Sequence, residues 1–175
     1  METKAKVAAL SVISNTLLVI LKLVVGLMIG SVSVVSEAIH SGLDLVAAMI
    51  AFFSVRTSSL PPDQEHRYGH GKIENVSGTI EALLIFVAAI WIIIEAGKKI
   101  IGNVEIEAVG PGLVVMGVSA LVNLGVSSIL FKVAKQTDSI ALEADALHLR
   151  TDVYTSLGVF AGLGLIELTG FAIFD

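Results

Sequence analysis

Five apolar runs, each about long enough to cross a lipid bilayer, constrain the fold of this chain more than any other feature. A transmembrane helix needs roughly 20 predominantly apolar residues, and the runs cover residues 7–29, 32–55, 78–96, 109–133 and 140–168. Of the 175 residues, 55% are apolar and only 15% are charged. We therefore predict an all-α membrane protein, a polytopic transmembrane helix bundle of about five helices, forming one transmembrane domain over residues 1–175.

The charge balance and the cysteine count exclude several function classes. Eleven Lys and Arg stand against 16 Asp and Glu, and the net charge of −5 has the wrong sign for a surface that binds nucleic acid. Because the sequence has no cysteine, it can form no disulfide framework, no thiolate zinc site and no cysteine nucleophile. Any bound metal must therefore have nitrogen and oxygen ligands.

The distribution of basic residues predicts the orientation, because cytoplasmic loops are enriched in Lys and Arg. If the five runs alternate in direction, Lys98 and Lys99 lie on one side of the membrane. The other side holds Lys4, Lys6, Arg56, Arg67, Lys72, Lys132 and Lys135. We predict an integral membrane protein of the plasma (inner) membrane with a cytoplasmic N-terminus.

Two apolar runs carry the same pattern, H-x-x-x-D. It occurs as His40 and Asp44 in the second run, and as His148 and Asp152 in the fifth. Residues i and i+4 share one face of a helix about 6 Å apart along its axis, so two facing helices would offer two imidazoles and two carboxylates. This donor set suits tetrahedral Zn²⁺. The alternatives for these residues are a proton relay or hydrogen bonds between helices.

A second candidate metal site lies in the polar loop of residues 56–77. His66 and His70 are four residues apart, and Asp63 precedes His66 by three. Asp63, His66 and His70 could bind a metal on the inner side. The alternative is that all three are ordinary solvated loop residues, since Gly69 and Gly71 indicate irregular backbone.

Other charged residues within the runs have simpler interpretations. Lys22 is expected to extend to an interface or to pair with a carboxylate, such as Glu37 or Glu81. Glu143 and Asp145 precede His148, and we interpret them as a solvated helix start, with attraction of cations toward the site as the alternative.

Together these stretches resemble the cation diffusion facilitator family. The resemblance rests on SEAIHSGLDLVAA in the second run, on D-x-x-H-x-x-G-H-G-K-x-E from Asp63 to Glu74, and on ADALHLRTDV in the fifth run. It implies export of divalent cations, most often zinc, in exchange for protons, by six-helix protomers that form homodimers. The family's transport site corresponds to His40, Asp44, His148 and Asp152, and the inner-loop site of some relatives to Asp63, His66 and His70.

The resemblance also indicates which ion is transported and how much of the family's fold this sequence covers. The His-Asp pairs are similar to those of zinc-preferring members, whereas members with more carboxylates extend to Cd²⁺ or Mn²⁺. Relatives continue through a sixth helix into a cytoplasmic domain, so we expect TGFAIFD at the end of this sequence to be the opening of that helix, cut short.

We expect a zinc efflux transporter rather than an enzyme. Protons compete with metal for imidazole nitrogens near the ordinary imidazole pKa of about 6.5, so a proton gradient could drive metal release outside. The alternatives are efflux of Fe²⁺, Mn²⁺ or Cd²⁺ through the same site, or a membrane protein that binds metal without transport. A membrane metallohydrolase is disfavoured because the sequence contains no H-E-x-x-H motif and four ligands leave no position for water.

Overall fold

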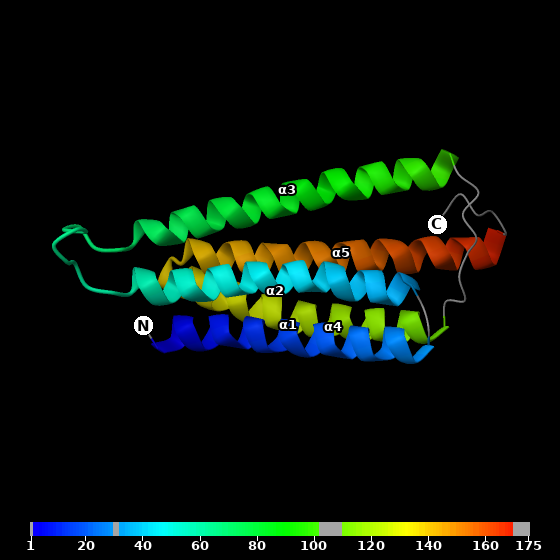
Figure 1. Cartoon of the computed structure of the whole chain (residues 1–175), viewed down its shortest axis with the longest axis horizontal. Helices are drawn as coiled ribbons and strands as arrows, with labels where there is room; N and C mark the ends of the chain where they lie inside the picture. The colour runs from blue at the N-terminus through cyan, green and yellow to red at the C-terminus, as the bar shows by residue number, and fades with distance from the viewer. Residues whose placement is uncertain (1, 30–31, 102–109, 170–175) are drawn as a thin grey trace.

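The described residues form five long helices, as the apolar runs predict. The computed structural model describes residues 2–29, 32–101 and 110–169. Its elements are α1 (Glu2–Ile29), α2 (Val32–Ser58), α3 (Lys72–Ile101), α4 (Gly110–Thr137) and α5 (Ile140–Thr169). The described residues contain no strand, and the helices lie roughly side by side along one direction (Figure 1). The prediction of an all-α polytopic membrane protein is confirmed. The residues after Thr169, expected to open a sixth helix, lie outside the described part.

Within the described residues, four helices are long and apolar enough to cross a membrane: Thr3–Met28, Glu37–Ser58, Lys72–Ile94 and Val114–Thr137. The helix α5 is not one of these four. Large apolar side chains cover the outside of the bundle, for example Leu27, Phe86 and Trp91, which are 66%, 63% and 68% exposed. Such a surface suits contact with lipid rather than with water.

The observed loop is shorter than the loop predicted at residues 56–77, because α2 and α3 each extend into it. The helix α2 continues to Ser58 and α3 begins at Lys72, so the non-helical segment is residues 59–71. Hydropathy detects only the apolar part of a helix, and polar helix ends escape it. The helix α2 ends shortly before Pro61 and Pro62, which cannot continue a helix.

One end of the bundle carries the start of α1, the α2–α3 loop and the short α4–α5 turn (Figure 1). We call it the loop end. The alternating runs predict seven basic residues on one side of the membrane. All seven belong to segments at this end. In the turn, Asp138 has a positive φ of 48°, and the N–H of Ser139 donates to the carbonyl of Ala134 at 3.1 Å. This is a left-handed helix cap that reverses the chain between α4 and α5.

Small side chains bring the helices close together. A Cβ on Gly78 of α3 would lie 2.8 Å from Cγ2 of Ile140 at the start of α5, and one on Gly26 of α1 would lie 2.9 Å from Cγ2 of Val35 of α2. These glycines therefore fix two helix crossings. The apolar core lies among α1, α2, α4 and α5 and consists of Ala8, Val55, Val126, Leu130, Val133, Ala134, Ala141, Leu142, Ala146 and Leu149.

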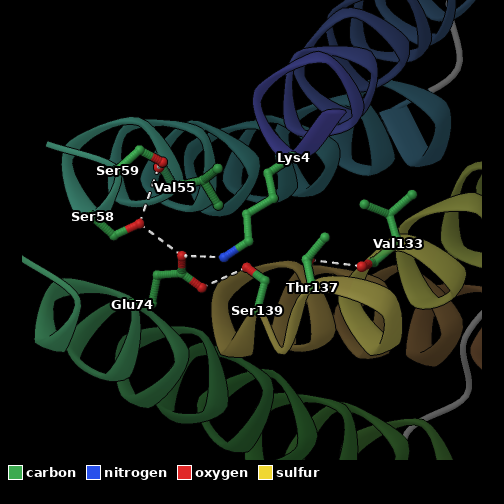
Figure 2. A network of polar contacts seen from close by, with 8 residues as sticks. All are labelled: Lys4, Val55, Ser58, Ser59, Glu74, Val133, Thr137 and Ser139. Atoms are coloured by element: carbon green, nitrogen blue, oxygen red, sulfur yellow. Dashed lines mark hydrogen bonds and ion pairs between the residues drawn. The ribbon is translucent and has the colours of Figure 1, made fainter. Parts of the chain in front are cut away.

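A polar junction ties four segments together at the loop end. Figure 2 shows the carboxylate of Glu74 between Lys4 of α1, Ser58 of α2 and Ser139 before α5. The Lys4 ammonium donates to Glu74 Oε1 at 3.0 Å, the Ser58 hydroxyl donates to the same oxygen at 2.7 Å, and the Ser139 hydroxyl donates to Oε2. Glu74 is 6% exposed, so three donors stabilise its buried charge. The junction therefore holds these helix ends together.

Candidate metal centres

The structure brings together residues of the two H-x-x-x-D pairs from α2 and α5. His40, Asp44 and Asp152 each place one potential ligand atom within 4.8 Å of the others. Asp44 is buried, and His40 and Asp152 are partly exposed. Because α2 and α5 pack against each other, the two sequence repeats face one another across a single interface. Three of the four predicted transport ligands can thus reach one ion.

The fourth residue, His148, contacts this group through Asp44. Its Nε2 lies 3.1 Å from Oδ1 of Asp44, and the two residues are 7% and 6% exposed. Its Nδ1 is buried and has no hydrogen-bond partner among the described residues. The arrangement offers nitrogen and oxygen donors in a water-poor part of the bundle, and a metal would replace the hydrogen bond between His148 and Asp44.

Lys22 of α1 lies beside this α2–α5 site. Its ammonium donates to Glu37 at 2.9 Å and to the hydroxyl of Ser41 at 2.7 Å. Lys22 is 5% exposed, so the ion pair and the hydroxyl replace the hydration that the ammonium loses. Of the two partners considered from the sequence, Glu37 is the one that it contacts.

The second cluster lies in the α2–α3 loop, where Asp63, His66 and His70 also bring ligand atoms within 4.8 Å of one another. Asp63 Oδ1 is 3.2 Å from Nδ1 of His66, and Oδ2 is 3.3 Å from Nε2 of His70. The two imidazole rings have centroids 4.4 Å apart. Asp63 and His66 are exposed, while His70 is buried. The three side chains converge as the spacing predicted.

The backbone of this loop is shaped around Asp63. Its carboxylate accepts N–H bonds from Glu65 at 3.0 Å and from His66 at 2.6 Å. These bonds form a turn closed by a side chain. Gly69 has a positive φ of 81°, a conformation that other L-residues rarely adopt, and it lets the chain return to His70. The N–H of His66 is the main cause that lowers the pKa of the Asp63 carboxyl below its ordinary 3.8.

Asp145 is buried, so the prediction of a solvated position for it is wrong. Its exposed fraction is 0%, as is that of Glu81 of α3. Glu143 is exposed, as expected. Asp145 precedes His148 by three residues and shares its inward face, whereas Glu143 points elsewhere. Helical spacing to His148 was the signal that could have revealed this burial.

Comparison with known proteins identifies the family. Residues 8–175 match the cation efflux transmembrane domain. The chain belongs to the cation efflux family. The resemblance drawn from its motifs is thereby confirmed, and the family is one of transporters. As expected of such a transporter, the chain has long apolar helices that pack around polar side chains.

Relatives in the cation efflux family are moderately similar to this chain. It is 36% identical to an uncharacterized transporter of Synechocystis over 146 residues, 83% of this chain and 47% of that protein. It is 32% identical to the manganese efflux system protein MneP of Bacillus subtilis over 169 residues, 94% of this chain and 55% of that protein. It is 29% identical to the cation-efflux pump FieF of Shewanella oneidensis over 157 residues, 90% of this chain and 53% of that protein. The chain spans about half the length of these relatives.

Proposed function

We propose that this protein exports a divalent cation, with Zn²⁺ as its preferred ion, in exchange for protons through His40, Asp44, His148 and Asp152. The observation that carries the proposal is the meeting of the two H-x-x-x-D pairs at the α2–α5 interface. Two imidazoles and two carboxylates suit tetrahedral Zn²⁺, and the two carboxylates offset its charge inside the bundle.

Proton coupling follows from the chemistry of the ligands. Imidazole binds metal only when neutral, so protons displace the ion from histidine ligands in acidic surroundings. If the bundle opens alternately to the two sides, an acidic outer side favours release there. The grouping of basic residues at the loop end supports a cytoplasmic location of that end. We propose the plasma membrane as the host membrane.

Manganese export is the second candidate. The similarity to a protein named as a manganese efflux system favours it, and carboxylates are ligands that Mn²⁺ accepts readily. Fe²⁺ and Cd²⁺ remain candidates for the same ligands. A bundle that binds metal without transport is the remaining alternative, and it predicts binding with no flux.

We also propose that Asp63, His66 and His70 bind a second ion at the loop end. Their convergence and the turn around Asp63 support this proposal. Assembly as a homodimer rests on the resemblance to the family alone.

Flux through proteoliposomes tests the transport proposal. The full-length protein is reconstituted and exposed to a pH gradient with Zn²⁺, Mn²⁺, Fe²⁺ or Cd²⁺ on the loop side. We expect flux to depend on the gradient and to be lost in His40→Ala and in Asp152→Ala. Glu143→Gln is the matched control because Glu143 is an exposed acid on α5. Unchanged flux in both site variants would refute the assignment, and a higher rate for Mn²⁺ than for Zn²⁺ would favour the second candidate.

A further inference from the structure

The buried face of α3 is polar, which is the reverse of an ordinary amphipathic helix. In the described part of α3, the buried residues are Glu74, Ser77, Gly78 and Glu81. The outward residues of this helix are mostly large and apolar, as in a segment surrounded by lipid. Two carboxylates and a hydroxyl therefore face the bundle where apolar packing would be expected.

Glu81 and Asp145 are the deepest acids in this region, and both are 0% exposed. Ser77 donates a hydrogen bond to Glu81 Oε1 at 3.1 Å. Oε2 of Glu81 and both carboxylate oxygens of Asp145 have no hydrogen-bond partner among the described residues. The Ser11 hydroxyl of α1 is likewise buried and has no hydrogen-bond partner among the described residues. Unsatisfied buried carboxylate oxygens are costly, and they require an explanation.

Glu81 and Asp145 occupy adjacent turns of two touching helices. A Cβ on Gly78 would lie 2.8 Å from Ile140 and 3.8 Å from Ala144, so α3 and α5 are in close contact here. Glu81 follows Gly78 by about one helical turn, and Asp145 is next to Ala144. Both acids are therefore buried at the level of this α3–α5 contact. Lys4 pairs with Glu74, Lys22 pairs with Glu37, and the imidazole of His148 faces Asp44.

This pair lies between the loop end and the transport ligands. Toward the loop end, a pocket of about 450 Å³ is lined by residues that include Lys4, Glu74 and Asp138. In the other direction, His148 follows Asp145 by three residues, about 4.5 Å along the helix axis. A cation that passes from the pocket to the α2–α5 site would meet Glu81 and Asp145 on the way.

We propose that Glu81 and Asp145 form a second intramembrane site that holds a divalent cation through oxygen ligands. Two carboxylates balance a charge of +2, and the hydroxyl of Ser77, which is bonded to Glu81, supplies a further oxygen atom. Such a donor set suits a hard ion such as Mn²⁺. The assignment of this site as a step on the entry route rests on the proposed transport function, but the binding of an ion there does not.

Metal counting in a non-transporting background tests the site itself. The full-length protein in detergent carries His40→Ala, Asp44→Asn, His148→Ala and Asp152→Asn, together with Asp63→Asn, His66→Ala and His70→Ala. Bound Mn²⁺ is measured by electron paramagnetic resonance. We expect this background to bind one more Mn²⁺ per chain than the same background with Glu81→Gln, and Asp145→Asn to remove the same ion. Glu143→Gln is the control and is expected to leave the count unchanged.

A separate measurement guards against misfolding. Glu81→Gln and Asp145→Asn are also made in the otherwise natural protein, where retained Zn²⁺ binding at the α2–α5 site demonstrates that the bundle is folded. An equal Mn²⁺ count with and without the acids would overturn the proposal. An infrared band of a protonated carboxyl would also overturn the proposal, if the band vanishes in Glu81→Gln but persists when Mn²⁺ is added. In that case a shared proton, and not a metal ion, would occupy the pair. Because the background used for Mn²⁺ counting lacks the transport ligands, the Mn²⁺ count is independent of the proposed export function.

Discussion

His148 and Asp44 are 104 positions apart in the sequence, yet Nε2 of one lies 3.1 Å from Oδ1 of the other. The contact joins α5 to α2 in the buried part of the bundle. Each residue is one half of an H-x-x-x-D pair, so this single contact aligns the two pairs. A metal ion bound at the proposed site would compete directly with this hydrogen bond.

Removal of either partner is expected to weaken metal binding. His148→Ala deletes an imidazole and Asp44→Asn removes a charge. Loss of a supporting residue around a metal typically costs 10–100-fold in affinity, so loss of a ligand should cost at least about tenfold. Isothermal titration of Zn²⁺ into the full-length protein measures the effect, with Glu143→Gln as control. Full affinity in both variants would place the ion elsewhere.

The close approach at Gly78 predicts a stability effect. In Gly78→Ala the new methyl group would lie 2.8 Å from Cγ2 of Ile140, and such overpacking costs about 1–3 kcal/mol. A lower melting temperature in detergent is the expected result. Gly125→Ala is the matched control on α4, because no atom lies within 4 Å of the added Cβ. Ile140→Ala in the Gly78→Ala background should restore stability, and an absence of rescue would contradict the crossing described here.

The ion pair between Lys22 and Glu37 predicts a double-mutant result. Lys22→Met leaves the Glu37 carboxylate without its ammonium partner. Loss of one partner of a buried pair costs about 3–5 kcal/mol, and the 35% exposure of the Glu37 side chain should reduce this cost through solvent screening. Lys22→Met with Glu37→Gln should recover part of the lost stability. Additive losses in thermal unfolding would mean that the two residues do not interact.

The lowered pKa of Asp63 predicts how the metal-free loop responds to acid. The N–H of His66 stabilises the ionised carboxylate, so the folded pKa lies below the ordinary 3.8. The contribution of this bond to the loop is therefore present above pH 3.8 and is lost as the pH falls through the lower, folded value. Amide chemical shifts of Glu65 and His66 would report the change. In Asp63→Asn the amide oxygen can accept the same bonds without titrating, and the acid transition should disappear.

The candidate ligands were accessible from the sequence because their spacing is local. Four residues make about one helical turn, so the pattern at His40 and Asp44 already places both side chains on one face. His66 and His70 lie in a non-helical segment, as Gly69 and Gly71 indicated, and Asp63 contacts both imidazoles. The burial of Asp145 was not predicted because it depends on which face of α5 meets α3 and the other helices of the bundle.

Local periodicity and hydropathy by themselves determined the helices, their number and the pairs that repeat on α2 and α5. These properties depend on residues within a few turns of one another and on the cost of exposing backbone to lipid. The tertiary structure decided which acids are buried and which partners they meet. Glu143 and Asp145 are two positions apart, yet one is exposed and the other is enclosed. A helix offers every face equally, and only packing against neighbouring helices selects the face that is removed from lipid and water.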